Sequence, residues 1–260
     1  MNERDLGPAA DAPAQTWSTR GGAYAASALH RSGPSLAKLL ALARPHPADS
    51  CLDLGTGAGH TAAALAARAE HVVGLDVSPG MVAAAQKAYG SVGNLEFVVA
   101  PAHDTGLSPD FGLITARHTL HHHTDLPATL REAARLLRPG GRLVIADEVT
   151  PDSEVDAWYD AVERARDPTH VRAYTVGEWR ALVAGAGLEW IVGDSDTRYD
   201  VDVESWLERM NPDAETTRAV YTLFDKADAY ARDVFEIEYS GGRAVRFQLP
   251  VALILAVKGA

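Results

Sequence analysis

A glycine-rich turn is the clearest candidate for chemistry in the sequence: Asp53 is followed by Gly55, Gly57 and Gly59, one at every second position. Gly55 permits a tight turn, and the other two glycines remove side chains where the backbone must approach a ligand closely. Amides at the start of the following helix would face an anionic or polar group. Asp76 ends the next apolar run about 20 residues later, where a ribose-binding carboxylate belongs in a Rossmann unit. The pattern therefore predicts a nucleotide-type cofactor site.

The spacing of the glycines discriminates between cofactors. The dinucleotide fingerprint would place its third glycine at position 60, which is His60 here. The sequence also has no Tyr-x-x-x-Lys pair of the dehydrogenase type. An NAD-dependent dehydrogenase is therefore disfavoured. A turn with only a structural role remains the alternative, and the carboxylate of Asp76 at the next strand end weighs against it.

Histidines form a second candidate group, at positions 118, 121, 122 and 123. Spacings of three and four would bring such side chains together on a helix and suggest a metal, but no acidic or cysteine ligand pattern accompanies them. His118 follows the fourth expected strand and is the preferred substrate contact or general base, because its ordinary pKa lies near neutrality. His121 and His122 are as suited to orienting the loop or packing as to acting in the chemistry. Asp147 and Glu148 follow the fifth strand and would face a substrate crevice or cap the next helix.

Short apolar runs alternate with helical patterns along the chain. Strands are expected at 50–54, 71–75, 95–99, 111–115, 142–146, 188–192 and 251–257. Helices are expected at 61–69, 79–89, 126–137, 155–166, 176–186, 203–210 and 216–231, with two short helices in 16–43 broken at Gly33-Pro34. Strands separated by helices at this spacing predict an α/β fold with a doubly wound, mostly parallel sheet.

Composition narrows the function classes. The 260 residues carry 24 Lys and Arg against 35 Asp and Glu, a formal net charge of −11, which disfavours binding to a nucleic-acid backbone. The single cysteine excludes an intramolecular disulfide. No apolar run reads as a secretory signal or is long enough to span a bilayer. We expect a cytoplasmic protein with a small-molecule substrate and neither a nucleic-acid nor a membrane partner.

Four ordered blocks, at 52–59, 73–78, 117–122 and 137–143, resemble class I S-adenosylmethionine-dependent methyltransferases, specifically the small-molecule group of the ubiquinone/menaquinone-biosynthesis type. The resemblance implies a Rossmann-like, doubly wound seven-stranded sheet whose last strand is antiparallel. It implies an N-terminal arm and helical cap over residues 1–45 and a cofactor-binding core over 46–193 plus 249–260. Residues 194–248 would be a lid insertion that covers one edge of the sheet.

The resemblance also assigns cofactor roles, position by position. Asp53 and the three glycines would bound the methionine portion of S-adenosyl-L-methionine, and Asp76 would accept hydrogen bonds from both ribose hydroxyls. The adenine would lie between Val77 and Met81. The family's adenine-reading Asp is missing from the run 100–103, where the amide of Ala102 and the ring of His103 would take its place. The backbone of Arg117 would face the methionine amino group, and Tyr24 of the cap would close over the cofactor or simply pack on the sheet.

For the acceptor, the resemblance implies a histidine pair without a metal, and we expect catalytic roles for His118 and His121. Substrate contacts would come from His30, His122, Asp147, Glu148 and His170. The expected reaction is methyl transfer to an oxygen, carbon or nitrogen of a small organic molecule, with S-adenosyl-L-homocysteine as product, by a monomer or homodimer. The alternative is a protein of the same fold that binds either compound without methylating, as a recruited non-methylating enzyme, a sensor or a partner subunit.

Overall fold

The strands of the computed structural model, which describes Trp17 and residues 33–260, form a single sheet. They are β1 (Ser50–Leu54), β2 (His71–Asp76), β3 (Leu95–Val99), β4 (Phe111–Arg117), β5 (Leu137–Glu148), β6 (Leu188–Asp202), β7 (Glu238–Ser240) and β8 (Arg243–Lys258). The order is β3-β2-β1-β4-β5-β8-β6, and β7 pairs with β8 outside this path. The first five strands are parallel, and β8 is antiparallel to β5 and β6. The predicted doubly wound sheet is confirmed, with β7 as an eighth strand.

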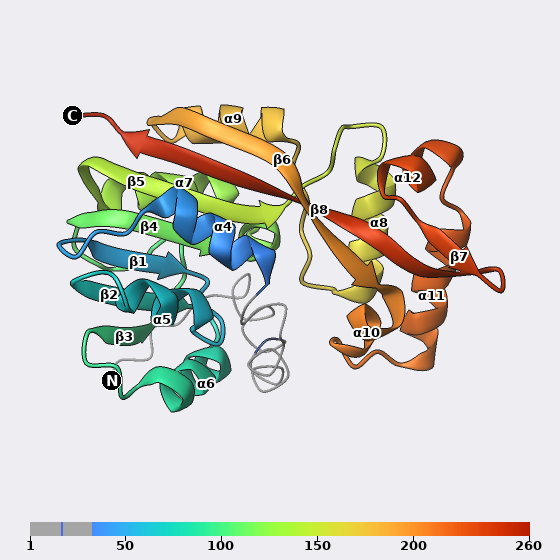
Figure 1. Cartoon of the computed structure of the whole chain (residues 1–260), viewed down its shortest axis with the longest axis horizontal. Coiled ribbons are helices and arrows are strands. Elements are labelled where there is room, and N and C mark those ends of the chain that lie inside the picture. The colour runs from blue at the N-terminus through green and yellow to red at the C-terminus, as the bar shows by residue number, and fades with distance from the viewer. Residues whose placement is uncertain (1–16, 18–32) are drawn as a thin grey trace.

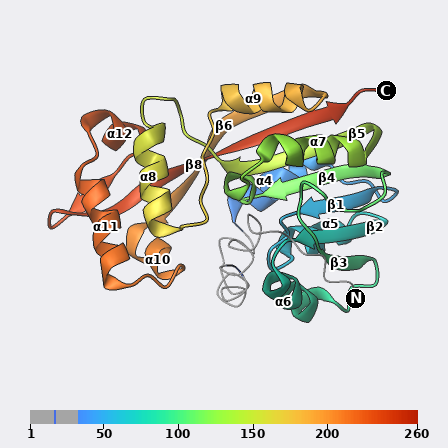
Figure 2. The ribbon, with the colours of Figure 1, turned by 180° about the vertical axis from the view of Figure 1, so that it is seen from behind.

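Helices cover both faces of this sheet (Figures 1 and 2). One face packs against α4 (Pro34–Ala43), α5 (His60–Ala66) and α6 (Pro79–Tyr89), and the other against α7 (Leu126–Leu136) and α9 (Val176–Gly185). Local signals explain where two of these helices begin. The Ser78 hydroxyl accepts the N–H of Met81 at the start of α6, and Thr175 and Glu178 form a capping box at the start of α9.

Beyond the carboxyl ends of the parallel strands lies a second group of elements, which we call the C-terminal lobe (Figure 1). It contains α8 (Asp156–Arg166), α10 (Val203–Glu208), α11 (Ala214–Asp225), α12 (Ala229–Val234), β7 and the adjoining parts of β6 and β8. Its interior is aromatic, with Trp206 and Phe224 each packed edge-on or tilted against Phe247. The lobe therefore caps the end of the sheet where the predicted site lies, and not the edge that we expected the insertion to cover.

Three strands are much longer than predicted: β5 runs from Leu137 to Glu148 where 142–146 was expected, and β6 and β8 extend further still. β6 continues to Asp202 and β8 begins at Arg243, so positions 194 and 248, expected as insertion boundaries, fall inside continuous strands. From Thr197 to Asp202, buried and exposed residues alternate, as in a strand with one covered face. The single helix expected at 216–231 is wrong, because Asp228 caps a new helix by accepting the N–H of Ala231. No helix in residues 33–260 is long and apolar enough to be a membrane span.

Candidate functional site

Asp53 anchors the glycine turn to the neighbouring strand. Its carboxylate is buried and accepts hydrogen bonds from the hydroxyls of Thr56 at 2.8 Å and Thr115 of β4 at 2.7 Å. Burial raises the pKa of Asp53 to about 6, against the opposing effect of these two hydroxyls. Both oxygen atoms of the Asp53 carboxylate are thus engaged, and they fix the glycine turn to the neighbouring strand.

The three glycines of the turn have different surroundings, although all three have positive φ: +61° at Gly55, +53° at Gly57 and +85° at Gly59. A Cβ atom added to Gly55 would lie 2.0 Å from Oγ1 of Thr119, and one on Gly59 would lie 2.9 Å from the ring of Phe97. A Cβ on Gly57 would meet nothing within 4 Å among Trp17 and residues 33–260. Gly55 and Gly59 therefore serve close packing, whereas Gly57 borders open space that a ligand could fill.

Asp76 lies beside this open space at the end of β2. One carboxylate oxygen accepts the N–H of Gly57 at 2.8 Å, and the other accepts the N–H of Ser78 at 2.9 Å. Burial raises the pKa of Asp76, while these backbone donors act in the opposite direction. Because each carboxylate oxygen has two lone pairs, both retain capacity for a donor such as a ribose hydroxyl.

The remaining predicted adenine contacts lie near the end of β2. Val77 is half-buried, and Met81 is buried in the first turn of α6. The amide of Ala100 donates to the carbonyl of Asp76 at 3.1 Å and brings the following loop alongside; in that loop Ala102 is buried and His103 is exposed. Together with the space at Gly57 and the acceptor capacity of Asp76, this arrangement fits a nucleoside-bearing ligand.

His118 begins the loop after β4 with a φ of +52°, which is uncommon for a residue with a side chain. Its Nε2 atom lies 3.1 Å from the hydroxyl of Ser35, which also accepts Nη1 of Arg117 at 3.3 Å. Burial and the charge of Arg117 lower the pKa of His118 to about 4, so its ring is neutral at pH 7. The Arg117 side chain also donates to Thr61 at the start of α5, at 2.9 Å.

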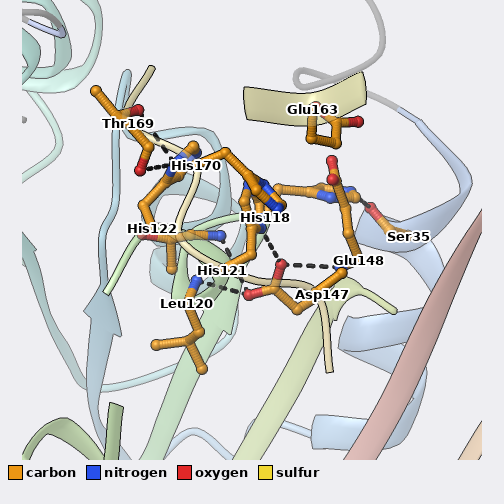
Figure 3. A network of polar contacts seen from close by, with 12 residues as sticks. Ser35, His118, Leu120, His121, His122, Asp147, Glu148, Glu163, Thr169 and His170 are labelled. Carbon is orange, nitrogen blue, oxygen red and sulfur yellow. Dashed lines mark hydrogen bonds and ion pairs between the residues drawn. The ribbon is translucent and has the colours of Figure 1, made fainter. Parts of the chain in front are cut away.

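Asp147 organises the rest of this loop (Figure 3). Its carboxylate is 0% exposed and accepts the N–H groups of Leu120 at 2.6 Å and Glu148 at 2.8 Å, and Nδ1 of His121 at 2.5 Å. Burial alone would lower the pKa of His121, but the charges of Glu148 and Asp147 outweigh burial and raise it to about 10. We expected Asp147 to face the substrate or cap a helix; instead, its oxygen atoms hold the backbone and ring of the loop.

The other predicted histidines gather around His121. Its ring centroid lies 4.0 Å from that of His122 and 5.6 Å from that of His170. His122 contacts the carbonyl of Thr169 at 3.1 Å, and burial holds its pKa well below the ordinary range. His170 is buried and its Nε2 lies 2.8 Å from Asp160. Within residues 33–260 and Trp17, no group of three or more His, Cys, Asp or Glu side chains has a geometry that could hold a metal.

Helix α8 contributes residues that the sequence analysis missed. The hydroxyl of Tyr159 lies 3.2 Å from Glu148 and 3.2 Å from Glu163, and Glu163 pairs with Arg166 at 3.2 Å. The only sequence signal for these residues is their spacing on one face of an amphipathic helix. That spacing does not distinguish residues of a functional site from residues that pack against a core. Ser35 was also missed. The predicted residues Tyr24 and His30 lie outside the described residues.

Comparisons with known proteins agree with this geometry. Residues 52–145 match a family model described as a methyltransferase domain. The chain is 30% identical over 231 residues to the uncharacterized methyltransferase YcgJ of Bacillus subtilis, covering 87% of this chain and 91% of that protein. The crystal structure of YcgJ superposes with a TM-score of 0.81 over 87% of this chain and 98% of that chain.

Two further relatives extend the comparison. A putative methyltransferase structure from Bacillus halodurans is 28% identical, with a TM-score of 0.82 over 86% of this chain and 99% of that one. The demethylmenaquinone methyltransferase of Clavibacter sepedonicus is 35% identical over 130 residues, or 49% of this chain and 53% of that protein. By these matches, the chain belongs to the class I S-adenosylmethionine-dependent methyltransferases.

Proposed function

We propose that this protein transfers the methyl group of S-adenosyl-L-methionine to a small organic molecule and releases S-adenosyl-L-homocysteine. The observation that carries the proposal is the pairing of Gly57, which borders open space, with the Asp76 carboxylate beside it. That pairing supplies a close approach to the backbone and an acceptor for two hydroxyls in one place. Family membership supports the same cofactor.

In this proposal, the residues at the ends of β1 and β2 hold the cofactor. Asp76 would accept the ribose hydroxyls, and Val77 and Met81 would flank the adenine. The amide of Ala102 and the exposed ring of His103 would meet the edge of the base. Asp53 and the glycine turn would bound the methionine portion, with Arg117 adjacent.

The acceptor would lie between the loop after β4 and the C-terminal lobe. The sulfonium of the bound cofactor supplies an electrophilic methyl carbon for in-line displacement. The chain itself would position the acceptor and exclude water, which alone accounts for large rate gains. The half-buried rings of His118 and His122 are neutral at pH 7, so they would offer hydrogen bonds without adding charge. The similarity to a demethylmenaquinone methyltransferase supports a small organic acceptor.

Calorimetric titration with S-adenosyl-L-methionine and, separately, with NAD tests the cofactor. We expect heat with the first ligand only, and the absence of heat with S-adenosyl-L-methionine would contradict the proposal. A chromatographic assay for S-adenosyl-L-homocysteine over a panel of hydroxyl, amine and carbon acceptors then tests transfer. Tight binding without product across the panel would favour the alternative of a cofactor-binding protein that does not methylate.

A further inference from the structure

Ser35, in the first turn of α4, is a buried serine whose N–H group and hydroxyl both contact distant segments; it is 0% exposed. Its backbone N–H donates to the hydroxyl of Tyr199 on β6 at 2.7 Å. Its own hydroxyl accepts Nη1 of Arg117 at 3.3 Å and lies 3.1 Å from Nε2 of His118 (Figure 3). Ser35 therefore joins α4 to β6 and to the end of β4.

The helix itself does not require the hydroxyl of Ser35. The N-cap of α4 is Gly33, and Ser35 follows Pro34 inside the helix, where alanine is the better helix former. A buried hydroxyl costs free energy unless it is hydrogen-bonded, and the partners of this one are the residues at the end of β4. The role of the hydroxyl therefore lies at that strand end.

The Ser35 hydroxyl satisfies both partners whichever ring nitrogen of His118 carries the proton. A hydroxyl has one hydrogen and two lone pairs, and one lone pair accepts from Arg117. If Nε2 of His118 is protonated, the second lone pair accepts from it; if Nε2 is not protonated, the hydroxyl donates to it. An alanine at position 35 would leave both side chains without this partner.

The segment that Ser35 contacts has an uncommon backbone conformation. His118 has a φ of +52°, and a residue in this region keeps such a conformation only where its surroundings hold it. Its N–H donates to the carbonyl of Ala146 on β5 at 2.9 Å, and its ring contacts Ser35. Loss of the Ser35 hydroxyl should therefore allow residues 117–119 to adopt other conformations.

The same segment borders the glycine turn. The strand register pairs Leu54 of β1 with Ala116 of β4, so Arg117 is the residue that comes next, beside Gly55. The Arg117 side chain also donates at 2.9 Å to Thr61 of α5, the helix that follows the turn. In the proposed function, the methionine portion of the cofactor would lie along this turn and the end of β4.

Strand β6 fixes α4 where the local sequence supplies no cap. Gly33 has no side chain to accept the first amides of the helix, and the Tyr199 hydroxyl accepts one of them from β6. One turn later, Nζ of Lys38 donates to Oγ1 of the buried Thr197, also on β6, at 2.9 Å. This second contact joins the same two elements and involves no residue of β4.

We propose that Ser35 is a positioning residue for the methionine portion of the cofactor, and that Tyr199 positions Ser35. This inference rests on the proposed function. Ser35 holds Arg117 and His118 in place before the cofactor binds, so binding does not have to order this segment. Without the hydroxyl, that ordering adds to the cost of binding, but only for ligands that reach the end of β4. The adenosine portion, beside Asp76, should be bound as before.

Titration calorimetry with S-adenosyl-L-homocysteine and with methylthioadenosine tests this role, because the second ligand lacks the amino-acid portion. Ser35→Ala should bind S-adenosyl-L-homocysteine about tenfold more weakly and methylthioadenosine within about twofold of wild type. Thr197→Val is the matched control: it removes a buried hydroxyl between α4 and β6 and should bind both ligands as wild type does. Binding of methylthioadenosine also reports that each variant is folded.

Tyr199→Phe is the second variant, because it keeps the Ser35 hydroxyl and removes only the partner of its N–H group. It should weaken S-adenosyl-L-homocysteine by about threefold and leave methylthioadenosine unchanged. Equal losses for both ligands, or no loss for either, would overturn the proposal; if Ser35→Ala does not fold, Tyr199→Phe decides by the same comparison. A wild-type protein that binds neither ligand would contradict the proposed function as well, so the two failures are distinguishable.

Discussion

The two halves of the site are built in different ways. At the ends of β1 and β2, the cofactor half consists of backbone N–H groups, glycines without side chains and one carboxylate, Asp76. At the ends of β4 and β5, the acceptor half consists of buried ionisable side chains drawn from three segments, with Asp147 at its centre. The first half suits a ligand shared by a whole family, and the second can vary with the acceptor.

Thr119 joins the two halves. Its side chain packs against the α-carbon of Gly55, and its N–H lies 3.3 Å from the carboxylate of Asp147. The glycine turn (residues 55–59) and the loop that carries the histidines (residues 118–123) are therefore in direct contact. A change at this contact is expected to disturb both halves, whereas changes farther from the end of β4 should affect only one.

The largest expected effect is that of Asp147→Ala, which breaks the acceptor half. Removing the carboxylate leaves a buried His121 without its anionic partner and three backbone N–H groups, those of Thr119, Leu120 and Glu148, without this acceptor. The expected cost is about 3–5 kcal/mol in the free energy of unfolding. Urea unfolding measures this cost. Thr175→Ala, which removes only the cap of α9, is the control and should cost about 1 kcal/mol. Equal costs for the two variants would contradict the central role of Asp147.

Gly55→Ala should have the next largest effect, because it disrupts the contact between Gly55 and Thr119 that joins the two halves. The new methyl group would overlap Thr119, and the alanine would have to keep the left-handed backbone conformation of Gly55. The expected total cost is about 2–4 kcal/mol in unfolding free energy. In a Thr119→Gly background the overlap is removed, so the cost of Gly55→Ala should fall to the conformational part of about 1–2 kcal/mol. Gly57→Ala, which meets open space, should show that smaller cost in both backgrounds. Identical costs of Gly55→Ala with and without Thr119 would rule out the proposed contact.

A change of pH acts on the acceptor half without any substitution. The pKa of His121 is raised to about 10 in the folded protein, from an ordinary value near 6.5. Its contribution to stability is therefore fully present below about pH 6.5 and is lost as pH rises toward 10. Urea unfolding across this window should show declining stability in wild type and a shallower decline in His121→Gln. A decline of equal slope in both proteins would contradict the raised pKa.

Much of the fold and of the cofactor half could be predicted because their signals are local. The β1 strand is found at the predicted bounds, and α6 spans the predicted residues 79–89 with Ser78 as its cap. The three glycines and Asp76 lie within one strand–helix–strand unit, so residues that are close in the sequence are also close in space. The long strands β6 and β8 were predicted only in part. Gly193 and several acidic residues interrupt the apolar pattern of β6, and Arg246, Gln248 and Pro250 interrupt that of β8.

The acceptor half could be predicted only as a collection of histidines. Its organisation depends on Ser35 of α4, Tyr159 and Glu163 of α8 and Asp147 of β5, which tertiary packing brings together. Residue type alone suggested His118 as the base. Its contact with Ser35, and the burial and Arg117 charge that lower its pKa, were not visible in the sequence. Ionisation states of this kind follow from contacts between distant segments, and a linear motif does not encode them.

The affinity for S-adenosyl-L-methionine in wild type and in Asp76→Ala tests the central assignment most directly. Titration calorimetry should show one cofactor bound per chain, and the variant should bind roughly 100-fold more weakly because it loses two charge-assisted hydrogen bonds. Glu148→Gln, at the other half, should retain affinity close to that of wild type. Unchanged affinity in Asp76→Ala, or no binding by the wild-type protein, would contradict the account of the cofactor half.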